Sequence, residues 1–293
     1  METNETREEI NGVAAIKKAF EALPSQAPLV HNITNYVTVN DCANALLAIK
    51  ASPIMSDEPD DVVDITSICN ALTINIGTLN EQSIKGMFLA GERAGELGHP
   101  IVLDPVGAGA SKLRTDTASD LLDRLNITVI RANMSEARAL AGAAATTRGV
   151  DVCPDDVVTR ENLHESARFA CELAARTNAV VVITGPIDLV ANAHQAYAIS
   201  NGSPLQSRIT GAGCMLSCIC AAYAAANEET LIEGMLAATV HMGLAGEQAA
   251  ARMGANDGNG AFRSYLLDAL YTMNADTLCA GAKIEAFEAA KSA

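Results

Sequence analysis

Residues 101–109 read Ile-Val-Leu-Asp-Pro-Val-Gly-Ala-Gly. The branched aliphatic side chains at the start are typical of a short buried strand, and Pro105 with the following glycines forces the chain out of the sheet. Asp104 therefore stands at the carboxyl end of that strand, where open α/β sheets collect their ligands. The segment predicts an α/β fold. Asp104 is either an organiser of a metal ion or phosphate, or a turn-capping aspartate.

Short β-branched runs alternate with longer helical patterns on both sides of this segment. The expected strands and following helices are Leu29–Ile33 with Val37–Ile49, Leu72–Ile76 with Glu81–Leu97, Ile101–Leu103 with Arg114–Leu125, and Ile127–Ile130 with Ser135–Leu140, then helix Asp156–Arg176 and strand Ala179–Ile183. This alternation predicts a mostly parallel central sheet with helices on both faces.

The remaining segments are read from their composition and punctuation. A helix over Arg7–Leu23 is expected to end at Pro24, and Ala141–Thr147 to be a loop. From about Leu205 onward the pattern is almost entirely helical. Because no repeat or low-complexity linker divides the chain, residues 1–293 are expected to form a single domain.

Charge and hydropathy argue against nucleic-acid binding, a membrane span and a secretory signal. Among 293 residues there are 35 Asp+Glu against 20 Lys+Arg, a net charge of -15, which disfavours nucleic-acid binding. The uncharged run Ile209–Asn227 contains Gly211 and Gly213 and is followed by Glu228, so a buried helix is favoured over a membrane span. Residues 1–11 are polar and acidic and do not form a secretory signal, which predicts a cytoplasmic protein.

A second strand end lies at Val129–Glu136, which reads Val-Ile-Arg-Ala-Asn-Met-Ser-Glu. Asn133 and Glu136 have the spacing of a helix capping box, which needs no catalysis to explain it. The functional alternative places Glu136 near an ATP-bound magnesium ion, because hard cations prefer oxygen ligands.

A third motif, Ile209-Thr-Gly-Ala-Gly-Cys214, precedes the uncharged run. Glycines at a helix start let backbone N–H groups approach phosphoryl oxygens, although a tight turn before a buried helix is the simpler interpretation. The eight cysteines contain no Cys-x2-Cys pair, which disfavours zinc ribbons and disulfide frameworks. Cys214 differs in lying at a helix start, where the helix dipole can lower a thiol pKa. Cys218 and Cys220 are expected to be core residues.

Two further clusters lie nearer the start of the chain, the first of them at the end of the expected strand from Leu29. They are His31-Asn-Ile-Thr-Asn-Tyr36 and Ala51-Ser-Pro-Ile-Met55. Either can hold a small neutral ligand, with Met55 giving a soft apolar contact, or can be an ordinary loop.

Taken in order, six blocks resemble the hydroxyethylthiazole kinase family, over about residues 25–226. They are 29–37, 51–55, 75–79, 102–109, 129–136 and 209–215. The resemblance implies a ribokinase-like α/β fold and a homotrimer with active sites at subunit interfaces. It also implies Mg2+-dependent transfer of phosphate from ATP to the primary alcohol of 4-methyl-5-(2-hydroxyethyl)thiazole.

The resemblance also assigns residues by position. The implied sites are Met55 and Gly211 with Asn35 and Gly77 for the thiazole, Arg131 and Thr184 for ATP, Asp104 and Glu136 around magnesium, and Cys214 where ribokinase relatives carry a catalytic aspartate. Two positions depart from the family pattern, since Ala212 stands for a threonine and Ala132 for a glycine. The segment 151–161 is longer than is usual in the family, and no site residue is assigned to it.

Two other functions are compatible with the same motifs. One is a ribokinase-type kinase of another heterocyclic alcohol, such as hydroxymethylpyrimidine. The other is a sensor of thiazole or nucleotide without turnover, for which Ala212 and Cys214 are the departures that count.

Overall fold

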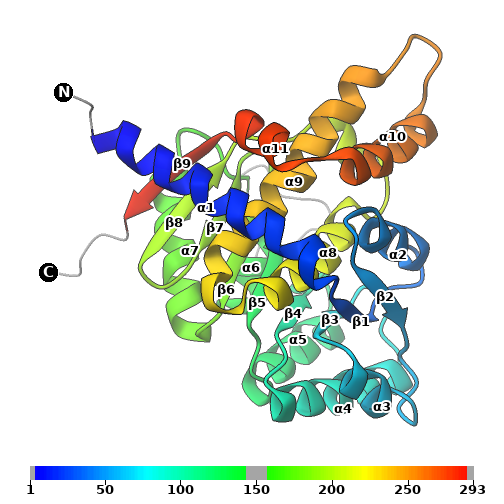
Figure 1. Ribbon diagram of the computed structural model, residues 1–293. Coiled ribbons are helices and arrows are strands. Elements are labelled where there is room, and N and C mark those ends of the chain that lie inside the picture. Colours follow the sequence, from blue (N-terminus) through cyan, green and yellow to red (C-terminus); the bar gives the residue numbers. More distant parts are fainter. Residues whose placement is uncertain (1–3, 143–156, 289–293) are drawn as a thin grey trace, which may run out of the picture.

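The computed structural model describes residues 4–142 and 157–288, and within them one nine-stranded sheet forms the centre (Figure 1). Its strands are β1 (Leu29–Ile33), β2 (Ser52–Met55), β3 (Ala71–Asn75), β4 (Ile101–Asp104), β5 (Val129–Asn133), β6 (Val180–Thr184), β7 (Asp188–Ala191), β8 (Gln195–Ile199) and β9 (Ile284–Glu288). The spatial order is β2-β1-β3-β4-β5-β6-β7-β8-β9. Strands β1 to β6 pair in parallel, and β7, β8 and β9 are added antiparallel.

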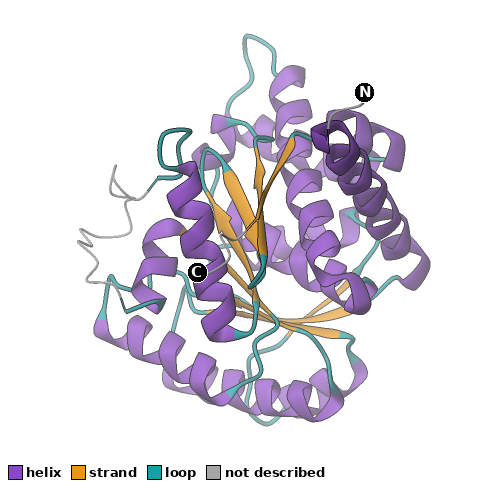
Figure 2. Ribbon diagram, turned by 90° about the vertical axis from the view of Figure 1, so that its left-hand side faces the viewer, coloured by secondary structure: helices purple, strands orange, loops and turns teal. Residues whose placement is uncertain are grey.

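Helices cover both faces of this twisted sheet (Figure 2). One face carries α1 (Asn4–Gln26), α2 (Val39–Ala48), α8 (Ala212–Ala226), α9 (Leu231–Arg252), α10 (Asn259–Thr272) and α11 (Ala275–Gly281). The other carries α3 (Val62–Ile68), α4 (Glu81–Leu97), α5 (Lys112–Arg124), α6 (Met134–Leu140) and α7 (Leu163–Thr177). Short 3-10 turns occur at η2 (Pro204–Arg208) and η3 (Glu228–Thr230). The predicted α/β fold with helices on both faces is confirmed.

Strand β4 shows how the sheet builds the two cores. Val102 packs with the cluster under α8 and α9, whereas Ile101 and Leu103 pack with the cluster under α4 and α5. Successive side chains of a strand point to opposite faces, and both faces are covered here. Every residue of β4 is consequently buried, as its apolar run predicted.

Helix α8 is enclosed from Met215 to Ala226, so the predicted buried helix is confirmed. An apolar helix that is buried on all sides belongs to the interior of a protein. Among the described residues, none of the helices combines the length and apolarity needed to cross a bilayer.

Two expectations were wrong in detail. Helix α1 continues past Pro24 to Gln26, because a proline in the last turn removes only one helical hydrogen bond and α1 is packed against α8 and α9. Helix α7 begins only at Leu163, since the side chain of Asn162 holds a turn by bonding the backbone of residues 157 and 159. The region after Leu205 is almost entirely helical as expected, and it also contains β9, which pairs with β8.

Parts of two expected loops lie outside the described residues. They are residues 143–147 of the predicted loop Ala141–Thr147, and residues 151–156 of the longer segment 151–161. Asp156, where helix α7 was expected to begin, belongs to the same part of the chain.

Candidate active site

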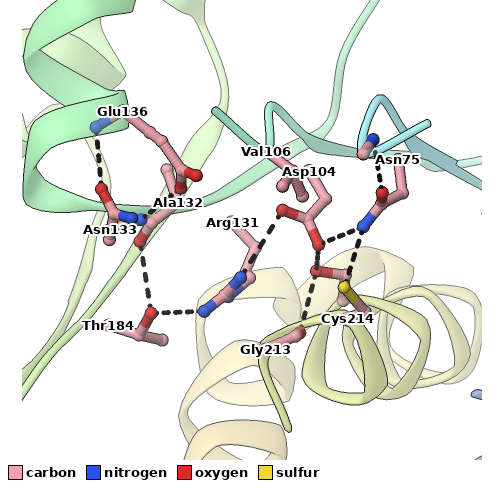
Figure 3. A network of polar contacts seen from close by, with 12 residues as sticks. Asn75, Asp104, Val106, Arg131, Ala132, Asn133, Glu136, Thr184, Gly213 and Cys214 are labelled. Carbon is pink, nitrogen blue, oxygen red and sulfur yellow. Dashed lines mark hydrogen bonds and ion pairs between the residues drawn. The ribbon is translucent and has the colours of Figure 1, made fainter. Parts of the chain in front are cut away.

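The carboxyl ends of the parallel strands bring most of the predicted site residues to one edge of the sheet. Asn75 ends β3 directly beside Asp104 at the end of β4, and Asn133 of β5 stands beside Thr184 of β6. Because parallel strands end at the same edge, residues far apart in sequence meet there. Figure 3 shows this edge with Arg131 between the Asp104 side and the Glu136 side of the site.

Asn75 is the centre of a buried hydrogen-bond network that sequence reasoning missed. Its Nδ2 donates to Asp104 Oδ2 at 2.7 Å and to Cys214 Sγ at 3.3 Å. Its Oδ1 accepts from Asn35 Nδ2 at 3.1 Å and from the Gly77 backbone N–H at 2.9 Å. All four hydrogen-bonding positions of the amide are therefore used. The signal was present, since Asn75 is a polar residue ending a buried strand, as Asp104 is.

Asp104 is fully buried and keeps one carboxylate oxygen free of hydrogen bonds. Oδ2 accepts from Asn75 and from Ser217 Oγ, each at 2.7 Å. Oδ1 lies 3.5 Å from Arg131 Nη1 and has no hydrogen-bond partner among the described residues. Burial raises the pKa of Asp104, and the Arg131 charge opposes that rise. The free oxygen is the feature of this carboxylate that a cation can use.

Arg131 and Thr184, the predicted ATP residues, are in contact. Arg131 Nη2 donates to Thr184 Oγ1 at 2.5 Å (Figure 3). The guanidinium is mostly buried, and its Nε has no hydrogen-bond partner among the described residues. A buried guanidinium with an unused donor is suited to hold an anionic group, because its charge-assisted hydrogen bonds are strong.

Glu136 is held as the capping box predicted. Its Oε1 accepts from the Gly107 backbone N–H at 2.8 Å, and its Oε2 accepts from the Asn133 backbone N–H at 2.9 Å. Asn133 Oδ1 in return accepts from the Glu136 backbone N–H at 2.8 Å. Burial, followed by the nearby charge of Asp104, raises the pKa of Glu136. Both carboxylate oxygens are thus already engaged with the backbone.

Cys214 lies in the first turn of α8, but its thiol does not have the lowered pKa that was expected at a helix start. Its sulfur accepts from Asn35 Nδ2 at 3.2 Å and from Asn75 Nδ2 at 3.3 Å. Burial, with a smaller contribution from the Asp104 charge, raises the pKa of Cys214 to about 11. The expected lowering of the thiol pKa was wrong, because loss of water around the buried sulfur is the largest influence on that pKa.

Gly211 caps α8 in a conformation that requires glycine. Its φ is 88°, and a Cβ there would lie 2.6 Å from Thr38 Cγ2. The first backbone N–H groups of a helix have no partner within the helix. The turn over residues 211–213 therefore presents N–H groups and the positive end of a 15-residue helix.

A cavity of about 790 Å³ opens over this helix start. Its lining includes Arg131, Thr184, Gly211 and Gly213. This volume lies within the range of small-molecule and cofactor sites. The cavity thus joins the two predicted ATP residues to the helix N-terminus.

Of the four expected thiazole residues, Gly211 lines this cavity, whereas Asn35, Gly77 and Met55 do not. Asn35 bonds the Cys214 sulfur, and Gly77 bonds Asn75. Met55 ends the edge strand β2, paired with Asn32 of β1, and is partly exposed. The structure thus places Asn35, Gly77 and Gly211 around Cys214, with Met55 at the end of a neighbouring strand.

The fit of a magnesium ion differs between the two acidic residues. Within the described ranges, no three His, Cys, Asp or Glu side chains converge on a metal position. Asp104 offers its free Oδ1, whereas both oxygens of Glu136 are engaged. Mg2+ is commonly held by one or two carboxylates together with substrate phosphates and waters. Of the two acidic residues, Asp104 is thus the one with an oxygen not engaged in a hydrogen bond, and that oxygen lies beside the Arg131 guanidinium.

Comparisons with known proteins agree with this architecture. The model of the "Hydroxyethylthiazole kinase family" matches residues 20–276. A hydroxyethylthiazole kinase from Clostridium acetobutylicum is 48% identical over 272 residues, covering 93% of this chain and 100% of its own. The solved hydroxyethylthiazole kinase protein from Pyrococcus horikoshii OT3 superposes with a TM-score of 0.82 at 36% identity, covering 93% and 99%.

A more distant structure supports the fold alone. A ribokinase-like superfamily protein from Enterococcus faecalis superposes with a TM-score of 0.58 at 13% identity, covering 87% of this chain and 88% of its own. The ribokinase-like fold that the resemblance implies is confirmed. By the family match and the close relatives, the chain belongs to the hydroxyethylthiazole kinase family.

Proposed function

We propose that the chain transfers the γ-phosphoryl group of ATP to the primary hydroxyl of 4-methyl-5-(2-hydroxyethyl)thiazole, giving the thiazole phosphate for thiamine salvage. The observation that carries this proposal is the position of Cys214. It lies at the helix start that opens onto the cavity of Arg131 and Thr184, and its sulfur is held by Asn35 and Asn75. A thiazole alcohol beside Cys214 would therefore face the phosphate-binding turn.

The ATP phosphates would be held by a few positive groups inside the cavity. A basic protein surface is not needed for this. The N–H groups of residues 211–213 and the Arg131 guanidinium supply that charge at the cavity, and Thr184 adds a hydroxyl. Phosphoryl transfer passes through a loose transition state, so positioning and electrostatic stabilisation carry most of the catalysis. The acidic net charge of the protein is compatible with ATP binding, because the positive groups at the cavity would contact the phosphates directly.

Cys214 would orient the substrate hydroxyl rather than remove its proton. A thiol whose pKa is raised to about 11 is almost wholly protonated at neutral pH. Its sulfur accepts two amide N–H groups, which leaves the thiol hydrogen to be donated to the hydroxyl oxygen. In a loose transition state the nucleophile loses its proton late, so the hydroxyl proton would pass to an oxygen of the transferred phosphoryl group and then to water, with no strong base required.

Magnesium would be bound by Asp104 through its free oxygen, and when bound it would neutralise charge that develops on the phosphates. Glu136 would act on the same region by holding the Gly107 N–H, which fixes the loop after β4. Burial raises the pKa of Asp104, and Arg131, 3.5 Å away, would oppose that rise and so favour the ionised carboxylate that a cation needs.

The homotrimer that the resemblance implies is also part of this proposal. Tyr36 and Val37 follow β1 next to Asn35, and they are 62% and 65% exposed. Large apolar side chains beside a site favour an interface over a free surface. A neighbouring subunit of a single-domain protein would complete the thiazole side of the site. We place the enzyme in the cytoplasm.

A coupled ADP-release assay with the thiazole alcohol and Mg-ATP tests the proposal directly. We expect ADP formation that depends on the thiazole and exceeds that with hydroxymethylpyrimidine. Faster turnover of the pyrimidine would instead support a kinase for that alcohol. Tight ligand binding with no ADP formed would support a sensor.

A further inference from the structure

Strand β9 lies beyond residues 20–276, which the family model matches, yet it is built into the sheet. It pairs antiparallel with β8, from Gln195 opposite Glu288 to Ile199 opposite Ile284. In Figure 1 this strand extends the sheet edge past β8. The segment that carries β9 is therefore fixed to β8, and residues 201–202 just after β8 line the cavity.

Asn201, just after β8, is bonded to the segment before β9. The Lys283 backbone N–H donates to Asn201 Oδ1 at 2.9 Å, and Asn201 Nδ2 donates to the Gly281 carbonyl at 2.9 Å. The Ser200 backbone N–H donates to the Lys283 carbonyl at 3.0 Å. Asn201 is buried, and with Gly202 it lines the cavity assigned above to ATP. We call residues 201–202 the rim.

Glu247 of α9 joins this segment to the rim through a single oxygen. Its Oε1 accepts from Asn201 Nδ2 and from the Gly202 backbone N–H, each at 3.1 Å. The same oxygen lies 2.8 Å from Lys283 Nζ. Although burial opposes the charge, these donors lower the pKa of Glu247, so it stays ionised at neutral pH. Lys283 is the only cation paired with Glu247 among the described residues.

Helix α9 also meets the rim without space between them. A Cβ at Gly243 would lie 2.8 Å from Asn201 Cβ and 3.0 Å from its backbone carbonyl carbon. Gly243 itself lines the cavity. The rim thus packs closely against α9 and is hydrogen-bonded to residues 281–283. Both contacts fix its position.

We propose that residues 281–283 and Glu247 form a positioning clamp that fixes the rim of the nucleotide cavity and thereby sets the affinity for nucleoside triphosphate. The assignment of the cavity to ATP rests on the proposed function. Neither Glu247 nor Lys283 belongs to the cavity lining. Their removal should therefore weaken nucleotide binding while leaving the phosphoryl-transfer step and the thiazole side unchanged.

The test compares Lys283→Met and Glu247→Ala with Lys17→Met as a matched control. Lys17 pairs with Asp276 at 2.9 Å, and its side chain is 44% exposed against 54% for Lys283. The measurements are KM for ATP, KM for the thiazole alcohol, kcat, and the Kd of the non-hydrolysable analogue AMP-PCP by calorimetry. Calorimetry reports on the clamp whether or not the thiazole alcohol is the true substrate.

We expect Lys283→Met to raise KM for ATP and the AMP-PCP Kd about threefold, the scale of one partly exposed ion pair. Glu247→Ala should raise both about tenfold or more, because Asn201 Nδ2 and the Gly202 N–H lose their acceptor. In both variants kcat and the thiazole KM should stay within about twofold. Lys17→Met should match the wild type.

Three results would overturn the clamp. The first is an AMP-PCP Kd within about twofold of the wild type in both Lys283→Met and Glu247→Ala. The second is an equal shift in Lys17→Met, which would show a general loss of stability. The third is a thiazole KM that rises as much as the ATP KM. If Glu247→Ala does not fold, Lys283→Met decides, since its side chain is exposed.

Discussion

The protonation state of Cys214 leads to a prediction about how the rate depends on pH. With a thiol pKa of about 11, the thiolate fraction at pH 7 is about one in ten thousand. If the thiolate were the base, kcat would rise about tenfold per pH unit between pH 7 and 10. If the protonated thiol orients the hydroxyl, kcat stays flat over this range until other groups titrate. We expect the flat profile.

Replacing Cys214 by serine distinguishes a base from an orienting group in a second way. The two roles differ in how far kcat should fall, as well as in how kcat depends on pH. A general base contributes about 10²- to 10⁴-fold to a rate. Cys214→Ser keeps a group that can both accept from Asn35 and donate to the substrate, so we expect kcat to fall by about tenfold or less. The assay is coupled ADP release at saturating substrates from pH 6.5 to 9.5, with Cys279→Ser as a control outside the site. A tenfold rise per pH unit in the wild type that disappears in Cys214→Ser would refute the reasoning.

Three further predictions test the surrounding network. Asp104→Ala and Glu136→Ala should each remove most kinase activity in steady-state assays. A normal rate would contradict the metal role of Asp104 in the first variant and the loop-fixing role of Glu136 in the second. Glu136→Ala should also lower the free energy of unfolding by about 1–3 kcal/mol in urea titrations, since two backbone N–H groups lose their acceptor. Asn75→Leu keeps the side-chain shape but leaves the Gly77 N–H and part of Asp104 unpaired, so a urea midpoint equal to that of the wild type would contradict the network. Gly211→Ala forces a positive φ on a residue with a Cβ, at about 1–2 kcal/mol, and should lower both the melting temperature and kcat/KM.

The sequence was sufficient to place the ends of the strands that carry Asp104, Arg131 and Thr184, but it did not predict β2, β7 or β8. Apolar runs ending in Asp104, in Arg131 and near Thr184 are local patterns, and parallel pairing brings such ends to one edge. The capping box at Glu136 is also local, since both partners lie within four residues. These features were predicted because each depends on neighbours in sequence.

The features that were missed depend on residues far apart in the chain. Asn75 acts through its position between Asn35, Asp104 and Cys214, and that position follows from the strand order β1-β3-β4 and from α8 above it. The thiol pKa was misjudged for the same reason, since burial comes from packing and the helix dipole from local geometry. Strand β9 is short and lies at an edge, so its pairing with β8 has little local signal.

The glycine at position 243 has a consequence for protein engineering. A glycine inside a helix costs about 0.5–1 kcal/mol relative to alanine, so Gly243→Ala is the kind of substitution that thermostabilisation campaigns select. Here the added methyl would meet Asn201 at 2.8 Å and push on the wall of the nucleotide cavity. Overpacking of this kind costs about 1–3 kcal/mol, more than the helix gain, so Gly243→Ala should lower the melting temperature as well as disturb the cavity wall. A thermostabilisation design for this enzyme should therefore leave Gly243 unchanged.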